Sequence, residues 1–394
     1  MNSHPPSSIL VAPKQSEGGL HARRILVRGT NWLGDAVMPT PALVRLREKF
    51  PEAHITLLTP EKLRDLWLHH PAVNETISFA PGEGVFSVGS TLRSGKYDLA
   101  LVFPNSPRSA LEVWLAGIPQ RIGYARPWRN FFLTTVVVPR AGSVKMRKLT
   151  VAEIRRRTGV TPVSNQIKNN LETGKMPVLQ TTAHQIHEYL NLVAALGADS
   201  EPLPPQLVVT PDEIEAVKKK FGLDMIGRPI FGLNPGAEYG PAKRWPVEKF
   251  IAAARDIQNR TSCTWLTFGS QTDAALAHRI ASAIASPPYA IWNLAGKTGL
   301  RELMVLLKLC RVLLTNDSGP MHVAAALGTP VVVPFGSTSP ELTGPGLPGD
   351  ARHRLLKSDA PCAPCFLREC PIDFRCLNGI SVERVVEAVL ATLN

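Results

Sequence analysis

The chain has 394 residues, of which 44% are hydrophobic, and it carries a formal net charge of +12. This length is sufficient for two domains, each with its own core. No apolar run approaches the ~18 residues that a membrane-spanning helix needs. Residues 1–23 are rich in Ser, Pro and Gly and lack the apolar core of a signal peptide. We therefore expect a cytoplasmic chain with a flexible N-terminal extension over residues 1–23.

The positive charge is concentrated in the first half. Residues 1–205 hold 24 Lys and Arg against 15 Asp and Glu (+9), whereas residues 206–394 hold 20 against 17 (+3). Residues 121–157 alone contain ten basic residues and one acid, Glu153. Such a segment favours an anionic partner, either a phosphorylated sugar or an acidic lipid surface, although it also fits an ordinary solvated basic surface. Because it matches no familiar nucleic-acid module, we expect no nucleic-acid partner.

Strand and helix patterns alternate from residue 24 onward. The first series ends near the proline-rich stretch Pro202–Pro205, which is typical of a linker, and residues 155–182 interrupt it with a non-periodic segment that we expect to be a flexible insertion. The strands expected before this linker are Arg24–Arg28, His54–Leu58, Thr76–Phe79 and Asp98–Phe103, with crossover helices at 42–50 and 61–68 and a final helix at 187–196.

A second alternating series follows the linker. Its expected strands are Pro229–Leu233, Thr264–Phe268, Arg311–Thr315 and Thr329–Phe335, with helices at 246–259 and from about Thr272. This alternation predicts an α/β fold of two Rossmann-like parallel-sheet domains, at 24–205 and 206–394.

The turn Asn316-Asp317-Ser318-Gly319-Pro320 is the most informative motif. A buried strand precedes it, Pro320 begins a helix and Gly328 ends that helix. The N–H groups and dipole at such a helix start attract an anion, and Ser318 and His322 can add donors. The alternative is that Asp317 or Ser318 only caps the helix.

Two more loops follow predicted strands. The loop at 234–246 contains Gly236, which permits close approach of a ligand, and Lys243 and Arg244, which can reach phosphate oxygens; it could also be an ordinary loop with solvated cations. The loop at 29–35 lacks the spacing of a dinucleotide fingerprint. Its Asp35 lies where a strand meets a helix, so it could act as a general base or merely as an N-cap.

Six cysteines complete the inventory. Cys263 and Cys310 lie in apolar segments and are expected to be buried, inert thiols. Four thiolates can make a tetrahedral zinc site, and the alternative is reduced structural thiols. The candidate ligands are Cys362, Cys365, Cys370 and Cys376.

In combination these residues resemble the bacterial lipopolysaccharide heptosyltransferases, from residue 24 almost to the end of the chain. The carrying segments are 25–37 (ILVRGTNWLGDAV), 104–106 (PNS), 116–123 (AGIPQRIG), 234–237 (NPGA), 243–246 (KRWP), 314–322 (LTNDSGPMH) and the terminal cysteine run. The resemblance implies a GT-B architecture, in which two Rossmann-like domains face a central cleft, the first binding the acceptor and the second the donor. It further implies inverting transfer of L-glycero-D-manno-heptose from ADP-heptose to the inner-core heptose on lipid A-Kdo, on the cytoplasmic face of the inner membrane.

The resemblance also assigns roles to residues. Asp35 would be the catalytic base, taking a proton from the acceptor hydroxyl, while the helix start and Lys243 would stabilise the charge on the leaving ADP. Gln271 stands where related members have a glutamate. The implied donor-binding residues are Gly236, Lys243, Gly269, Ser270, Gln271, Asp317, Ser318, Gly319 and His322, and the acceptor-side candidates are Asn105, Ser106, Arg121 and Arg126.

Two other functions fit the same motifs. A nucleotide-sugar epimerase of this fold would form product from the donor alone. A non-catalytic protein that binds a nucleotide sugar or a membrane surface would tolerate loss of Asp35.

No Asp-x-Asp arrangement is present, so we expect no essential metal cofactor.

Overall fold

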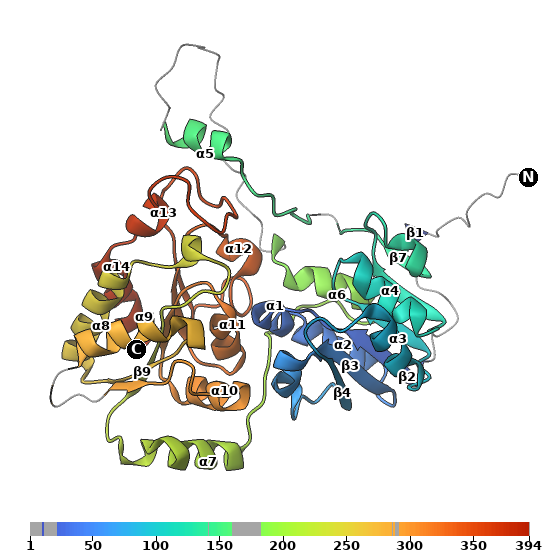
Figure 1. Cartoon of the computed structure of the whole chain (residues 1–394), viewed down its shortest axis with the longest axis horizontal. Helices are drawn as coiled ribbons and strands as arrows, with labels where there is room; N and C mark the ends of the chain where they lie inside the picture. Colours follow the sequence, from blue (N-terminus) through green and yellow to red (C-terminus); the bar gives the residue numbers. More distant parts are fainter. Residues whose placement is uncertain are drawn as a thin grey trace, which may run out of the picture. The chain divides into compact units, whose positions relative to one another are not determined.

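A computed structural model describes residues 10–11, 22–140, 142–159, 183–285, 287 and 291–393. These residues form two compact units (Figure 1). The first comprises the described residues up to Ser143 together with Gln185–Glu215 and Gly299–Val305, and the second comprises the described parts of Val144–His184, Ala216–Thr298 and Leu306–Asn394. Most of the expected N-terminal extension and residues 160–182 of the expected insertion lie outside the described residues.

The first unit is built on a seven-stranded parallel sheet in the order β1-β7-β6-β5-β2-β3-β4. The strands are β1 (Leu10–Val11), β2 (Arg24–Arg28), β3 (His54–Pro60), β4 (Glu75–Phe79), β5 (Leu99–Val102), β6 (Gln120–Tyr124) and β7 (Thr135–Val137). The helices are α1 (Leu33–Val37), α2 (Thr40–Lys49), α3 (Val85–Arg93), α4 (Pro107–Leu115) and α6 (Ile186–Ala194), with the 3-10 turns η1 (Glu61–Trp67) and η2 (Asn130–Phe132).

The second unit has a six-stranded parallel sheet in the order β10-β9-β8-β11-β12-β13. The strands are β8 (Ile230–Asn234), β9 (Thr264–Thr267), β10 (Ile291–Asn293), β11 (Leu313–Thr315), β12 (Val331–Pro334) and β13 (Arg354–Leu356). The α-helices are α5 (Val151–Thr158), α8 (Val247–Thr261), α9 (Ala274–Ile284), α11 (Gly319–Ala326), α12 (Pro340–Thr343), α13 (Arg375–Asn378) and α14 (Val382–Leu390), with η4 (Leu223–Met225), η5 (Pro241–Lys243) and η6 (Gln271–Asp273) as 3-10 turns. The boundary between the units falls inside α7 (Pro211–Phe221) and α10 (Leu300–Leu309).

Both sheets have the strand order of a doubly wound nucleotide-binding fold. In the first sheet, β2, β3 and β4 follow one another toward one edge, and β5, β6 and β7 toward the other. In the second sheet, β8, β9 and β10 do the same on one side and β11, β12 and β13 on the other. The order therefore reverses between β2 and β5 and between β8 and β11. Loops diverge at such a switch point and leave a crevice outside the carboxyl ends of the strands, where ligands bind in this class of fold. The predicted α/β fold of two Rossmann-like sheets is confirmed.

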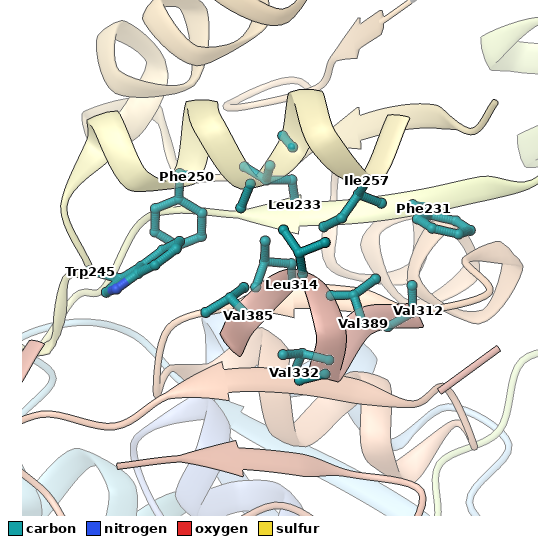
Figure 2. Close-up of a cluster of buried hydrophobic side chains, with 14 of the residues drawn as sticks. Phe231, Leu233, Trp245, Phe250, Ile257, Val312, Leu314, Val332, Val385 and Val389 are labelled. Carbon is teal, nitrogen blue, oxygen red and sulfur yellow. The ribbon is translucent and has the colours of Figure 1, made fainter. Parts of the chain in front are cut away.

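The core of the second unit explains why its loops are held in place. Figure 2 shows Phe250 and Ile257 of α8 and Val385 of α14 directed toward Leu233 and Leu314 of the sheet. All five side chains are fully buried. Because β8 and β11 are anchored by this packing, the loops that follow them start from fixed positions.

Three expectations differ from the structure. Leu10–Val11 pairs with β7, so this part of the expected extension belongs to the sheet. Residues 151–158 form α5, whose N-terminus is fixed by a capping box between Thr150 and Glu153. The units are also discontinuous: residues 144–159 group with the second unit, where Leu149 N–H donates to the Cys365 carbonyl, and no single boundary falls at residue 205.

Among the described residues, no helix is long and apolar enough to cross a membrane.

Candidate active site

The predicted anion-binding turn lies at the β8/β11 switch point of the second unit. β11 ends at Thr315, and α11 begins at Gly319 with Ser318 as its N-cap residue. The Ser318 side chain makes no capping hydrogen bond; its hydroxyl instead accepts a hydrogen bond from Asn234 Nδ2 at 3.1 Å. Ser318 is therefore not the simple helix cap that the sequence left open, and the N–H groups of the first turn remain suited to an anion.

Lys243 and Asp317 meet at this turn. The Lys243 ammonium lies 2.7 Å from the Asp317 carboxylate, and the Thr338 hydroxyl donates to the same carboxylate oxygen. Asp317 is buried, and the Lys243 side chain is only 14% exposed. The ammonium also lies 4.8 Å from the centre of the Tyr239 ring. A cation fixed in this way beside a helix start is a preorganised contact for phosphate oxygens.

Two asparagines connect the loops that diverge at the switch point. Asn234 Nδ2 donates to the Thr315 hydroxyl at 3.1 Å, in addition to its bond to Ser318. Asn316 Nδ2 donates to the Pro235 carbonyl at 2.7 Å, and Asn316 Oδ1 accepts from the Trp245 N–H at 2.9 Å. These bonds tie the Lys243 loop to the start of α11. Both asparagines lie in motifs named from the sequence, but the sequence does not indicate these bonds, because those to Thr315 and Pro235 each join residues 81 positions apart.

His322 lies in the first turns of α11 and is buried. Burial lowers the pKa of its imidazole to about 4, and this effect outweighs the opposing influence of Asp317. At neutral pH the ring is therefore uncharged, so it can donate one hydrogen bond and accept another but adds no positive charge.

Asp273, which no sequence motif indicates, organises the glycine loops of this unit. Its carboxylate accepts hydrogen bonds from the Ser270 N–H at 3.1 Å and the Ser270 hydroxyl at 2.6 Å. A Cβ added at Gly236 would lie 2.6 Å from this carboxylate, and one added at Gly269 would lie 2.9 Å from Asp273 Cβ. Both glycines therefore allow the loops after β8 and β9 to close around Asp273, whereas Gln271 is exposed and packs beside Gly296.

Asp35 lies at the switch point of the first unit. It lies in the first turn of α1, after the carboxyl end of β2 and therefore at the β2/β5 switch point, and it is half-buried. The Tyr189 hydroxyl is close enough that the Asp35 carboxylate, after burial, contributes to raising the pKa of that phenol. The carboxylate is thus positioned at the ligand-binding edge of the sheet.

A buried ion pair supports the loop that leads to Asp35. Arg28, the last residue of β2, places Nε 2.8 Å from the Glu112 carboxylate, and both side chains are almost fully buried. Arg28 Nη1 donates to the Gly29 carbonyl and to Asn31 Oδ1. The pair therefore connects the end of β2 and the following loop to α4, and sequence reasoning missed it because the two residues are 84 positions apart.

The acceptor-side candidates do not all gather at one place. Asn105 and Ser106 follow β5 and lie at the same edge as Asp35, where Asn105 accepts from Arg129 and Ser106 caps α4. Arg126 follows β6 and lies at this edge as well. Arg121 is instead the second residue of β6, near the opposite edge of the parallel sheet, where its guanidinium donates to the Phe132 and Ile118 carbonyls. The structure therefore does not bring Arg121 to Asp35.

The four clustered cysteines line one small, largely apolar pocket together with Phe374 and Ile154. All four are free thiols, and Cys370 accepts a hydrogen bond from the Phe374 N–H at 3.2 Å. In the part of the chain that the structure describes, no group of three or more His, Cys, Asp or Glu side chains is arranged to hold a metal ion. Cys263 and Cys310 are buried as expected.

Comparison with known proteins places these features in a family. Residues 142–374 match the model of glycosyltransferase family 9 (heptosyltransferase). Over 360 residues the chain is 33% identical to lipopolysaccharide heptosyltransferase 2 of Escherichia coli, an alignment that covers 86% of this chain and 91% of that protein. It is 34% identical to the Salmonella typhimurium enzyme of the same name, covering 82% and 85%.

Solved structures agree with the sequence comparisons. E. coli ADP-heptose LPS heptosyltransferase II superposes with a TM-score of 0.71 at 30% identity, covering 94% of this chain and 98% of that one. A glycosyl transferase family 9 protein from Veillonella parvula superposes with a TM-score of 0.72 at 22% identity, covering 94% and 97%, which shows the shared fold.

Proposed function

Because the chain belongs to glycosyltransferase family 9, the heptosyltransferases, we propose that it transfers a heptose from ADP-heptose to the core of lipopolysaccharide. The chain is a glycosyltransferase of GT-B fold. The finer proposal is that the sugar is L-glycero-D-manno-heptose, that the acceptor is the inner-core heptose on lipid A-Kdo, and that the anomeric carbon is inverted.

The second unit binds the donor in this proposal. The observation that carries it is the contact of Lys243 with Asp317 beside the uncapped first turn of α11. The α11 N–H groups and the Lys243 ammonium would hold the diphosphate, and they would stabilise the charge that develops on the β-phosphate as ADP leaves. Ser318, Gly319 and the neutral imidazole of His322 complete this wall of the site. Gly236, Gly269, Ser270 and Gln271 would face the remainder of the ADP.

The first unit supplies the base and the acceptor contacts. Asp35 would accept the proton of the acceptor hydroxyl while the oxygen attacks the anomeric carbon and the bond from that carbon to the ADP oxygen breaks. The electron pair of the broken bond leaves with ADP, so one base suffices for inversion. Asn105, Ser106 and Arg126 lie at the Asp35 edge of the sheet, which supports them as acceptor contacts.

The place of action follows from the acceptor. A lipid-linked acceptor is confined to a membrane, so we propose that the chain works at the cytoplasmic face of the inner membrane as a peripheral protein. The excess of basic residues in the first 205 positions supports attraction to an anionic membrane surface.

One assay tests the reaction. Purified protein is offered a panel of nucleotide sugars with a heptose-bearing core acceptor, and products are identified by mass and linkage analysis. We expect heptose addition from ADP-heptose and no change in the donor when the acceptor is omitted. Conversion of the donor alone would instead identify an epimerase, and absence of any product with every donor would contradict the proposal.

A zinc ion bound by Cys362, Cys365, Cys370 and Cys376 stays a prediction from their spacing. Their convergence on one pocket supports it, although the side chains are not arranged as metal ligands. Elemental analysis of protein purified without chelators tests the prediction. About one zinc per chain, lost in a Cys362→Ser/Cys365→Ser variant, would support it, and a metal-free active protein would contradict it.

A further inference from the structure

An unusually exposed group of aromatic side chains lies on the first unit. Trp128 is 89% exposed and Phe131 is 77% exposed, and Trp114 at the end of α4 is 41% exposed. Phe132 packs edge-on against Trp114 at 5.7 Å and against Phe131 at 5.5 Å between ring centres. We call Trp114, Trp128, Phe131 and Phe132 the aromatic patch. Large aromatic groups gathered in this way on a surface mark an interaction site, unlike scattered apolar residues.

The backbone of the loop keeps Trp128 in this position. Trp128 has φ of +64°, a left-handed conformation that is unfavourable for a bulky side chain. The loop is closed by hydrogen bonds from the Phe132 N–H to the Arg129 carbonyl and from the Leu133 N–H to the Asn130 carbonyl. Arg129 anchors it from inside, donating to the Pro104 carbonyl at 2.8 Å. The exposed indole is therefore part of an ordered turn.

The sequence that contains the patch is basic. Between Glu112 and Glu153 the sequence contains seven Lys and Arg residues and no Asp or Glu. Arg121 donates to the Phe132 carbonyl, and Arg93 donates to the Leu115 carbonyl next to Trp114. Glu112, the nearest acid in sequence, is buried and paired with Arg28 and Arg108. An aromatic group with arginines beside it is complementary to the interface of an anionic bilayer, where aromatic rings lie at headgroup depth and cations contact lipid phosphates.

The patch is also connected to the acceptor edge of the sheet. Its loop begins immediately after β6, and Arg129 in that loop donates to Asn105 Oδ1, the residue that follows β5 beside the Asp35 edge. The patch extends from there toward the opposite edge, where Trp114 ends α4 and Arg121, near the start of β6, donates to the Phe132 carbonyl. A lipid-linked acceptor brings its sugars close to a membrane, so a membrane contact along this side of the first unit would keep the acceptor near the unit.

We propose that the aromatic patch docks the first unit onto the anionic membrane surface, a proposal that rests on the proposed lipid-linked acceptor. Trp128 and Phe131 enter the headgroup region, and Arg93, Arg121 and Arg126 contact anionic lipid headgroups. The patch thus raises the local concentration of a membrane-embedded acceptor without touching the donor.

Vesicle co-sedimentation of the full chain tests this proposal. Vesicles of phosphatidylglycerol and phosphatidylethanolamine (30:70) are compared with pure phosphatidylcholine vesicles. We expect the parent to bind the anionic vesicles and to be released from them as NaCl rises to 0.5 M. The double variant Trp128→Ser/Phe131→Ser should have a partition coefficient onto these vesicles at least tenfold lower than that of the parent. Met225→Ser is the matched control, because Met225 is 91% exposed on the second unit and should bind as the parent does.

Activity separates the failure of this proposal from that of the proposed function. With a deacylated, water-soluble acceptor the double variant should turn over as the parent does, whereas with vesicle-embedded acceptor its KM should rise at least fivefold at unchanged kcat. Parent-like vesicle binding by the double variant, or equal loss in Met225→Ser, would overturn the membrane assignment even if transfer is normal. If instead the double variant converts a parent oligomer to a monomer in solution and leaves vesicle binding unchanged, the patch is a contact between copies and the proposal is wrong. Absence of transfer to the soluble acceptor by the parent would contradict only the proposed function.

Discussion

The Lys243 ammonium lies 2.7 Å from the Asp317 carboxylate at the start of α11. Without a ligand, the Asp317 carboxylate balances the charge of the Lys243 ammonium. A bound diphosphate would therefore share Lys243 with Asp317. The carboxylate also fixes the position of the ammonium, because Thr338 and burial hold Asp317 in place. In the proposed donor site, the pair would combine attraction for phosphate with a limit on how strongly ADP is retained.

Replacing Lys243 separates binding from structure. Lys243→Met should weaken ADP binding about 10- to 100-fold, since hydrogen bonds to charged groups contribute ~1.5–3 kcal/mol, and it should destabilise the fold by leaving Asp317 buried without its cation. Lys243→Met/Asp317→Asn is the control: it should recover much of the stability but none of the affinity. Calorimetric titration with ADP and thermal unfolding measure both. Parent-like affinity in Lys243→Met would remove this residue from the donor site.

Gly236→Ala should disturb the donor loops without changing any charge. The new methyl group would lie 2.6 Å from the Asp273 carboxylate, a contact that forces Asp273 or the loop after β8 to shift. We expect at least a tenfold loss of ADP affinity. Gly227→Ala is the matched control, because a Cβ there meets no atom within 4 Å. Equal ADP titrations of the two variants would show that the Gly236 loop does not approach the nucleotide.

Sequence reasoning predicted the elements that carry periodic apolar patterns and missed the contacts that connect them. Strand Arg24–Arg28 and the helix start at 318–320 lie where predicted, since each depends on local pattern and on Gly or Pro at a boundary. Asp273 and Glu112 could not be found in this way. Asp273 matters because two glycine loops close on it, and Glu112 because it pairs with an arginine in a distant strand.

Arg121 lies away from the other acceptor candidates for a simple physical reason. Arg121 matches a family segment, but it is the second residue of β6, and side chains at the start of a parallel strand lie at the edge opposite the ligand-binding loops. Placing it required the start of the strand, and element boundaries are the least certain part of a sequence-based prediction.

Asp35→Asn should abolish transfer and leave ADP binding nearly unchanged. The amide keeps the size of the side chain at the start of α1 but cannot accept the proton of the acceptor hydroxyl. Steady-state rates should fall at least 10³-fold, while calorimetric titration with ADP gives the affinity of the parent. Turnover within tenfold of the parent would show that another group is the base.

The Arg28–Glu112 pair makes a prediction for stability. Glu112→Ala removes the carboxylate from a buried guanidinium, so we expect a loss of about 3–5 kcal/mol in the free energy of unfolding. Arg28→Met/Glu112→Leu, which leaves no uncompensated charge, should lose much less. Urea unfolding of the parent, Arg28→Met, Glu112→Leu and the double variant gives the coupling energy. A near-zero coupling would mean that the pair does not hold the loop before Asp35.

Acid pH should destabilise the fold through its buried imidazoles, and His70 offers the simplest case. It is buried next to Trp67, its Nδ1 accepts from the Ala72 N–H at 3.3 Å, and burial lowers its pKa to about 4 from 6.5. As pH falls below 6.5, His70 is protonated in the unfolded chain before it is protonated in the folded chain. Its contribution to the free energy of unfolding is therefore fully present above pH 6.5 and is lost progressively toward pH 4. The full shift corresponds to ~3 kcal/mol. His322 and His353 have the same direction of shift, so the parent loses more than one such increment. His70→Gln should therefore lose about 2 kcal/mol less than the parent between pH 7.5 and 5.0 in urea unfolding. An identical pH dependence of the parent and His70→Gln would show that the imidazole is already hydrated in the folded chain.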